Sequence, residues 1–171
     1  MEELEREIDF FNGFCKPEFY VVQTGSLVKE INQAGAFNEQ FTAKVAKLLK
    51  DRDIKLKEHN VDYLPASEIT LRRGMVDAMN IAPQLGVIQT QLVLTKCLIY
   101  GIDFSDFINE VYAGGKWQKW LHKNSPENKF LCAVIAGHYH FASDRYLDIL
   151  KKLEYMEDIH ESIINSLMDV I

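Results

Sequence analysis

The alternation of apolar and polar residues in the first half of the chain predicts three short strands. Residues 19–23 are rich in β-branched and aromatic side chains, and Pro17 and Gly25 bound them. Residues 54–57 alternate apolar and polar side chains, which is the pattern of a strand with one exposed face. Residues 76–81 give the third strand. The long polar loop over residues 24–37 follows the first strand, and such loops are often functional.

The spacing of apolar residues predicts helices between these strands and throughout the rest of the chain. One helix covers residues 1–11, another follows a cap at Asn38, and a weaker one covers residues 67–73. A longer helix over residues 84–100 ends at Gly101. The order β-α-β-α-β-α indicates parallel strands joined by crossover helices. Beyond Asp103 we expect only helices, at residues 104–112, 116–123, 127–141, 144–152 and 155–171.

This order predicts an α/β fold that is incomplete by itself. Three parallel strands leave a sheet edge unpaired, whereas a (β/α)₈ barrel has eight strands and about 250 residues. We therefore expect a partial TIM (β/α)8-type barrel, with its last three βα units in residues 1–101 and an all-helical C-terminal extension of the same domain in residues 102–171. On this view the chain is the C-terminal portion of a larger barrel. The alternative is a small, complete three-layer α/β domain with a fourth strand that the pattern hides.

Composition excludes several classes of protein. The net charge of −6 argues against a broad nucleic-acid surface. The strongest apolar run, residues 131–136, is far shorter than the roughly 20 residues of a membrane span, and the acidic N-terminus does not resemble a signal peptide. Cys15, Cys97 and Cys132 form no metal or disulfide pattern, which favours a reducing, cytoplasmic location.

A polar cluster at the end of the second strand predicts a functional site. Glu58, His59 and Asn60 end the strand, and Asp62 and Tyr63 follow in a loop. The carboxyl ends of parallel strands are where α/β proteins gather substrates and metals. Strand alternation places Glu58 and His59 on opposite faces, and we expect His59 to point inward. His59 is then either a ligand of a divalent metal such as Zn²⁺ or a structural hydrogen-bonding residue that orients Asn60 and Asp62. Glu58 is either a general base or an outward-facing carboxylate.

Three short motifs resemble a known family. Residues 21–25 (VVQTG), 58–63 (EHNVDY) and 78–87 (AMNIAPQLGV) occur in the order found in the C-terminal half of the non-catalytic subunit family of class II D-tagatose-bisphosphate aldolase. The likeness continues at residues 116–120 (KWQKW) and 127–130 (ENKF). The resemblance implies a cytoplasmic protein of tagatose or galactitol metabolism. Its implied partners are a catalytic class II aldolase subunit, the missing N-terminal half of the barrel, or both, and a sugar phosphate is a further candidate ligand; it implies neither nucleic acid nor membrane.

The wider aldolase superfamily suggests roles for individual residues. His59 is similar in position to a metal-binding histidine, and Asn80-Ile81 is similar to a substrate-holding pair; Asn80 alternatively caps the next helix. The chain departs from the superfamily at residues 60–63, which replace a glycine-rich phosphate loop and include Asp62, whose charge repels phosphate. No second histidine follows Gln23. This part of the sequence therefore offers one candidate zinc ligand, whereas zinc needs three or four. The candidate site residues are catalytic Glu58 and His59, substrate-binding Gln23, Asn60, Asp62, Asn80 and Gln84, and metal-binding His59.

Two functions of different class remain open. The first is a stabilising, non-catalytic subunit of an aldolase, favoured by the lost phosphate loop and the missing metal ligands. The second is a metal-dependent ketose-phosphate epimerase or aldolase in which His59 assists enolate chemistry. His138 and His140 do not add a metal site, because residues two apart on a helix point away from each other.

Overall fold

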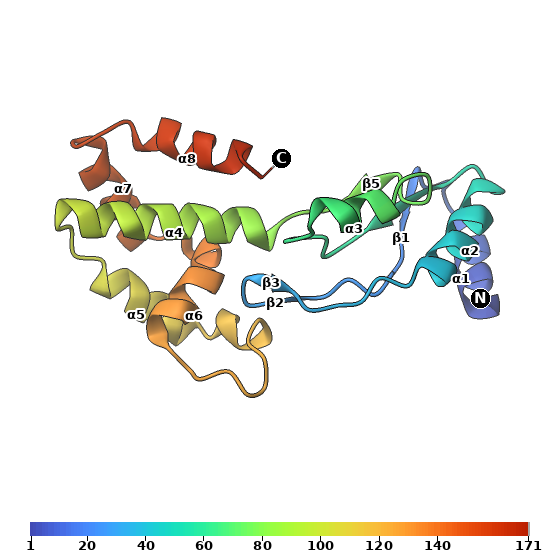
Figure 1. Ribbon diagram of the computed structural model, residues 1–171, viewed down its shortest axis with the longest axis horizontal. Coiled ribbons are helices and arrows are strands. Elements are labelled where there is room, and N and C mark those ends of the chain that lie inside the picture. Colours follow the sequence, from blue (N-terminus) through green and yellow to red (C-terminus); the bar gives the residue numbers. More distant parts are fainter. Residues whose placement is uncertain (171) are drawn as a thin grey trace. The chain divides into compact units, whose positions relative to one another are not determined.

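The computed structural model describes residues 1–170, which divide into two compact units (Figure 1). The first unit comprises Met1–Val28 and Asn32–Ile81, and the second comprises Lys29–Ile31 and Ala82–Ile171. The elements of the first part of the chain are α1 (Glu2–Asn12), β1 (Phe19–Val21), β2 (Val28–Lys29), β3 (Asn32–Gln33), α2 (Glu39–Lys50), β4 (Lys55–Glu58), α3 (Ala66–Leu71) and β5 (Ala78–Met79). The domain division after residue 101 stays a prediction.

The first unit contains a three-stranded parallel sheet in the order β1-β4-β5. Phe19 pairs with Lys55, and Lys57 pairs with Ala78, so the predicted parallel arrangement is confirmed. The predicted partial TIM barrel is wrong, because the described residues form only this open sheet and the short β2-β3 pair. The strands are two to four residues long, and nothing within residues 1–170 closes them into a ring.

One face of the sheet is covered by helices and the other is open. Ile8 of α1 and Val45 and Leu49 of α2 share a core with Leu56 of β4. Leu56 is 1% exposed, as expected for the covered face of an alternating strand. On the opposite face, Phe19 and Val21 are 39% and 47% exposed. The sheet therefore presents apolar side chains that the described residues leave accessible.

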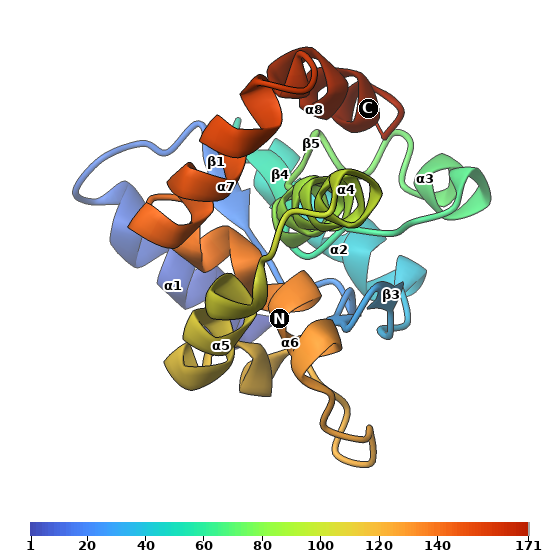
Figure 2. The same cartoon turned by 90° about the vertical axis from the view of Figure 1, so that its left-hand side faces the viewer.

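The second unit is helical, as the periodicity predicted. Its elements are α4 (Pro83–Tyr100), α5 (Ser105–Gly114), the 3₁₀ helix η1 (Lys116–Lys119), α6 (Lys129–Ala136), the 3₁₀ helix η2 (Gly137–His140), α7 (Asp144–Glu154) and α8 (Ile159–Met168). Figure 2 looks along α4, with other helices of this unit around it. α4 contacts α6, α7 and α8, and Val93, Leu94 and Cys97 are fully buried in the shared core. Gly101 ends α4 in the left-handed conformation with φ of 65°, which confirms the predicted stop.

Capping residues explain why some helices differ from their predicted bounds. The Asn128 side chain accepts a hydrogen bond from the Leu131 amide, so α6 begins at Lys129 instead of residue 127. The Asp158 carboxylate caps α8 through the Glu161 amide, which moves its start from residue 155 to Ile159. The predicted helix over residues 127–141 also changes to 3₁₀ geometry at Gly137. A Cβ at Gly137 would lie 2.7 Å from Thr90 Cγ2, so this turn requires glycine against α4.

The described helices include none that is both long and apolar enough to cross a membrane. Cys97 and Cys132 are buried, while Cys15 is exposed, and all three are free thiols. Burial raises the pKa of the Cys97 thiol to about 11.

The tip of the β2-β3 hairpin belongs to the second unit. The Glu30 amide donates to the Trp120 carbonyl oxygen at 2.7 Å, and Lys29 Nζ donates to the Lys119 carbonyl oxygen at 2.7 Å. Ser125 Oγ donates to the Glu30 carboxylate. Glu30 itself has a positive φ of 54°, a conformation that the turn imposes on a non-glycine residue. The sequence pattern identified this loop as long and polar but did not reveal the hairpin.

His138 and His140 have separate surroundings. His140 Nδ1 lies 2.9 Å from Glu110 Oε1, whereas the His138 ring packs against α4, where a Cβ at Gly86 would lie 2.4 Å from His138 Cβ. Burial, and secondarily the Lys119 charge, lower the pKa of His138 below its ordinary value. His138 Nδ1 is buried without a hydrogen-bond partner among the described residues.

The lowered pKa of His138 predicts a pH-dependent stability. Because the unfolded chain takes up this proton at the ordinary pKa of about 6.5, the free energy of unfolding decreases as pH falls below that value and levels off below the folded-state pKa. We expect His138→Gln to show a smaller decrease in Tm between pH 7.5 and pH 5.5 than the parent chain does. His160→Gln is the matched control, since His160 is exposed beside Glu154. An unchanged pH profile in His138→Gln would contradict the assignment.

Candidate functional site

The carboxyl end of β4 carries a buried ion pair. Glu58, the last residue of β4, is 0% exposed, and Arg72, which follows α3, is 1% exposed. Arg72 Nε donates to Glu58 Oε2 at 2.7 Å, and Arg72 Nη2 donates to Glu58 Oε1 at 3.2 Å. This two-point contact is the geometry that guanidinium and carboxylate groups prefer. Neither charge is left unpaired on removal from water.

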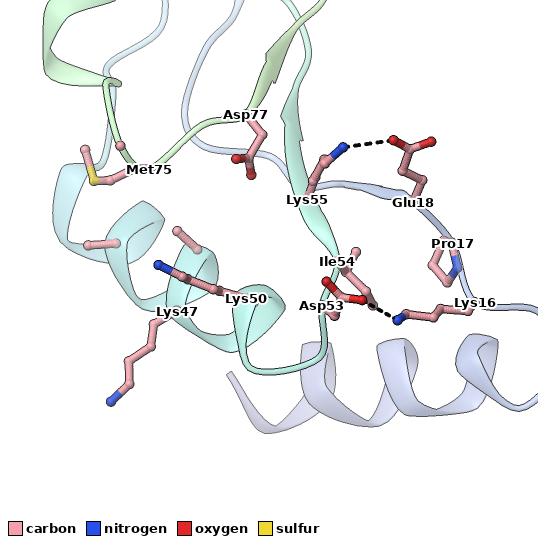
Figure 3. Close-up of a pocket in the computed structure, with 13 residues that line it drawn as sticks. Lys16, Pro17, Glu18, Lys47, Lys50, Asp53, Ile54, Lys55, Met75 and Asp77 are labelled. Atoms are coloured by element: carbon pink, nitrogen blue, oxygen red, sulfur yellow. Dashed lines mark hydrogen bonds and ion pairs between the residues drawn. The ribbon is translucent and has the colours of Figure 1, made fainter.

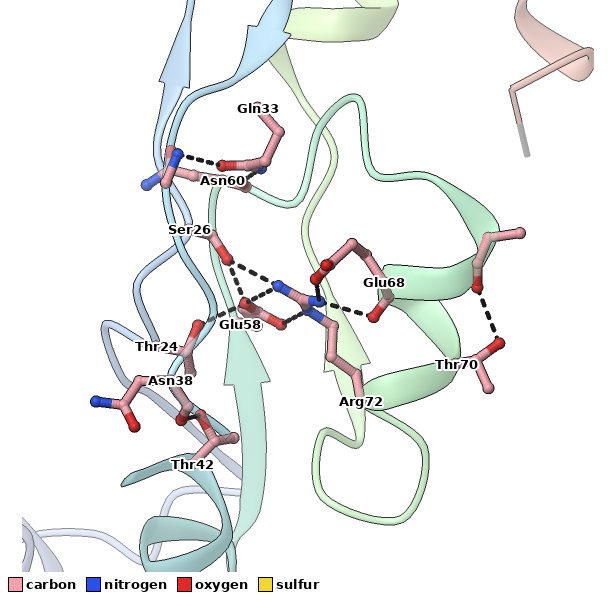
Figure 4. A network of polar contacts seen from close by, with 12 residues as sticks. Thr24, Ser26, Gln33, Asn38, Thr42, Glu58, Asn60, Glu68, Thr70 and Arg72 are labelled. Carbon is pink, nitrogen blue, oxygen red and sulfur yellow. Dashed lines mark hydrogen bonds and ion pairs between the residues drawn. The ribbon is translucent and has the colours of Figure 1, made fainter. Parts of the chain in front are cut away.

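Two hydroxyl groups complete the surroundings of Glu58 (Figure 4). Thr24 Oγ1 donates to Glu58 Oε1 at 2.5 Å, and Ser26 Oγ donates to the same oxygen. Both residues are 2% exposed. They belong to the loop after β1, so the cluster joins the carboxyl ends of two neighbouring parallel strands. The Glu58 carboxylate therefore accepts hydrogen bonds from three side chains.

All five N–H donors of Arg72 have protein acceptors. Besides the bonds to Glu58, Nη1 donates to the Glu68 carbonyl oxygen at 2.7 Å and to Glu68 Oε2 at 3.1 Å. The second Nη2 donor approaches Ser26 Oγ at 3.4 Å. The Phe37 ring lies under the guanidinium, with 4.0 Å between the ring centroid and Cζ. Arg72 is thus held as an internal partner of Glu58, with no donor left for an external anion.

A close approach between two glycines shapes the loop that carries the hydroxyl groups. Gly25 has a φ of 108°, a conformation that favours glycine. A Cβ on Gly35 would lie 2.0 Å from the Gly25 carbonyl oxygen, so the two backbone segments touch. The Asn38 amide also donates to the Thr24 carbonyl oxygen at 2.9 Å. These contacts fix Thr24 and Ser26 beside Glu58.

Gln33 fastens the loop after β4. Its Nε2 donates to the carbonyl oxygens of Asn60 at 2.8 Å and Asp62 at 3.1 Å. Its Oε1 accepts from the Leu27 amide at 2.7 Å. Asn60 and Tyr63 have φ values of 58° and 60°, and Gln33 supports this turned backbone. Burial, with the Asp62 charge, raises the pKa of Tyr63 well above its usual range.

The structure reverses the predicted orientation of the central pair. His59 is exposed and Glu58 is buried, so the expectation that His59 points inward is wrong. Strand alternation allowed either choice, and the buried Arg72 decides it because only a carboxylate can pair with a guanidinium there. The sequence pattern did not predict this ion pair, because Arg72 and Arg73 near the end of a helix are equally consistent with an anion contact and with two exposed arginines. The only available signal was its spacing from Glu68, one helical turn earlier.

The remaining predicted substrate-binding residues each have their own surroundings. Gln23 is exposed, and its Nε2 donates to the Ser26 carbonyl oxygen at 2.8 Å. Asp62 is 0% exposed. The Asn80 amide donates to the Glu58 carbonyl oxygen at 2.9 Å, which places Asn80 next to the cluster through its backbone. Gln84 lies in the first turn of α4, in the second unit. Their roles in substrate binding stay predictions.

The donor set does not fit a zinc site. Zinc in proteins needs three or four ligands, and no group of three His, Cys, Asp or Glu side chains placed to hold a metal occurs among residues 1–170. His59 is exposed, and Glu58 already accepts from three side chains. A metal-binding role for His59 stays a prediction.

A cavity of about 460 Å³ lies beside the ion pair. Glu39 and Glu68 bring carboxylates to its wall, while Arg72 is turned to its internal partners. The other lining residues are Ser26, Gln33, Gly35, Ala36, Phe37, Leu64, Pro65 and Leu71. Such a wall disfavours a phosphate group.

Comparisons with known proteins concern the fold alone. No family model matches the sequence, and no curated protein does so. Among solved structures, the chain is similar to the crystal structure of a probable tagatose 6 phosphate kinase from Sinorhizobium meliloti 1021. The TM-score is 0.53 at 14% identity, over 96% of this chain and 43% of the other. The chain thus spans less than half the length of that structure. Membership of the aldolase-subunit family stays a prediction.

Proposed function

We propose that this chain is a non-catalytic, stabilising subunit-like protein of tagatose metabolism that binds a class II aldolase. The observation that carries this proposal is the open sheet face, where Phe19 and Val21 are 39% and 47% exposed. Parallel sheets are normally covered on both faces, so such a face suits a protein partner. The similarity to a probable tagatose 6 phosphate kinase and the resemblance of three motifs to the aldolase subunit family support the choice of metabolism.

The polar groups at the strand ends favour a stabilising role over a catalytic one. Glu58 and Arg72 satisfy each other, and Thr24 and Ser26 donate to Glu58. A general base must reach a substrate proton, whereas the Glu58 side chain is fully buried by the described residues and a substrate cannot reach it. The epimerase or aldolase alternative depends on His59, which is exposed and belongs to no group of three or more potential metal ligands among residues 1–170.

The open face carries positive charge beside its apolar residues. Lys55 and Lys57 alternate with the covered residues of β4, so they share a face with Phe19 and Val21. Lys55 lies over the Phe19 ring, 5.2 Å from its centroid. A matching surface is apolar at its centre and carries carboxylates at its margin.

Co-purification tests this proposal. We expect a tagged class II tagatose-bisphosphate aldolase, co-expressed with the chain, to retain it, and Val21→Glu to weaken retention by about tenfold or more because a charge is then buried at the contact. Tyr155→Glu is the matched control, since Tyr155 is 80% exposed at the end of α7. Equal loss in both variants, no retention of the parent chain, or turnover of tagatose phosphates by the chain alone would contradict the proposal.

A further inference from the structure

A cavity of the first unit lies at the opposite end of the sheet from Glu58. It has a volume of about 730 Å³, within the usual range for small-molecule sites, and it lies between α2, the start of β4 and the turn before β5 (Figure 3). Its wall contains Lys16, Lys47, Lys50 and Lys55 together with Glu18, Asp53 and Asp77. In a chain with a net charge of −6, this wall carries a net positive charge.

Two of the lysines are neutralised by two of the carboxylates. Lys16 Nζ lies 2.6 Å from Asp53 Oδ2, and Lys55 Nζ lies 2.9 Å from Glu18 Oε1. The hydrogen bond from Lys16 lowers the pKa of Asp53, and the hydrogen bond to Glu18 raises the pKa of Lys55, so each pairing favours the charged form of Asp53 and of Lys55. These pairs form one side of the cavity and contribute no net charge.

Lys47 and Lys50 supply the excess positive charge. They occupy the last turn of α2, and no ion pair involves either of them in the described part of the chain. Residues three apart on a helix are neighbours, with about 5–6 Å between their Cβ atoms. In Figure 3 the Lys50 side chain extends on the side of Met75, whereas the Lys47 side chain points away from Met75 and Asp77. An anion there also meets the partial negative charge of the α2 C-terminus, so its attraction depends on the lysines.

Small residues leave room for a ligand beside Lys50. Ala43 and Ala46 line the cavity from α2, and Gly74 lines it from the turn after α3. A Cβ on Gly74 would meet no atom within 4 Å, so the space at this wall is open. Asp77 forms no ion pair in the described part of the chain, although its charge helps to raise the pKa of Lys55; its Oδ2 accepts from the Leu56 amide at 2.8 Å.

We propose that this cavity binds a small molecule with a phosphate or carboxylate group, held by Lys50, with Lys47 adding positive charge at the cavity's margin. The proposal is independent of the subunit function, because the cavity lies at the amino ends of the strands. It shares one residue, Lys55, with the open sheet face. The ligand carries one anionic group on a body of a few carbon atoms, which the volume accommodates. Asp77 opposes the anion and limits its affinity.

Isothermal titration of the full chain with four probes tests the proposal. The probes are inorganic phosphate, glucose 6-phosphate, gluconate and glucose. We expect Lys50→Gln to weaken binding of the anionic probes by about fivefold, the effect of one charge at about 4 Å in water, and Lys47→Gln to weaken it less. Asp77→Asn keeps an acceptor for the Leu56 amide but removes the opposing charge, so we expect it to tighten binding by up to about fivefold.

Lys44→Gln provides the matched control, because Lys44 lies on α2, is exposed and does not line the cavity. We expect it to change affinity by less than about twofold, since an exposed charge further from the anion is screened by salt. Tighter binding of glucose 6-phosphate identifies phosphate as the preferred group, and tighter binding of gluconate identifies carboxylate. Equal losses in Lys44→Gln and Lys50→Gln, binding of glucose as tight as that of glucose 6-phosphate, or no binding at about 10 mM phosphate or sugar anion would overturn the proposal.

Discussion

Arg72→Met is expected to lower the free energy of unfolding by about 3–5 kcal/mol, as measured by urea denaturation followed by circular dichroism. The variant leaves the Glu58 carboxylate, which is 0% exposed, without its cationic partner. Thr24 and Ser26 still donate to this carboxylate, but hydroxyl groups do not neutralise its charge. The loss is therefore expected to exceed that of a typical surface substitution several times over.

Two further variants separate the ion pair from simple loss of volume. Arg73→Met is the matched control, because Arg73 is exposed beside Arg72, and we expect a change within about 0.5 kcal/mol. The double variant Glu58→Leu with Arg72→Met removes both charges and is expected to be more stable than Arg72→Met alone. A double variant less stable than the single one, or a loss below about 1 kcal/mol in Arg72→Met, would contradict the role of the pair.

Gly35→Ala is expected to lower the free energy of unfolding by about 3 kcal/mol, the upper part of the range for overpacking. Its Cβ would lie 2.0 Å from the Gly25 carbonyl oxygen and 2.5 Å from the Leu27 amide nitrogen. Both are backbone atoms, so relief requires movement of the loop that holds Ser26. The same urea titration measures the effect.

Gly74→Ala separates close packing from backbone conformation. Gly74 has a φ of 79°, but its Cβ would meet no atom within 4 Å. We expect a cost of about 1 kcal/mol, from the left-handed conformation alone. If Gly35→Ala costs no more than Gly74→Ala, the glycine contact does not shape the loop. If the contact between Gly25 and Gly35 shapes the loop, the effects of Gly35→Ala and Arg72→Met on the free energy of unfolding should be non-additive, because both variants disturb the same cluster.

Local patterns in the sequence predicted most elements of secondary structure. Asn38 caps α2 through the Phe41 amide, and Gly101 ends α4, as the cap residues indicated. The parallel order of β1, β4 and β5 also followed from the alternation of strands and helices. The prediction of a barrel was wrong, because closure depends on the number and length of the strands. Local patterns do not reveal these properties, and β5 has only two residues.

The sequence predicted a polar cluster at the end of β4 but not the orientation of its residues; the site itself stays a prediction. The strand end at residues 58–60 does hold a polar cluster, yet its buried member is Glu58 and not His59. Alternation fixes that neighbours face opposite ways but not which one faces inward. The deciding partner, Arg72, lies 14 residues further along the chain, and such a contact leaves no periodic signal. The hairpin over Val28–Gln33 was missed for a similar reason, since its strands have two residues each.

The buried pair of Glu58 and Arg72 also has an evolutionary consequence. Replacement of either residue alone leaves an unpaired charge in the interior. A single replacement therefore gives a poorly folded protein, unless both codons change together. The two positions should therefore change together during evolution: either both are replaced by apolar residues or both are kept.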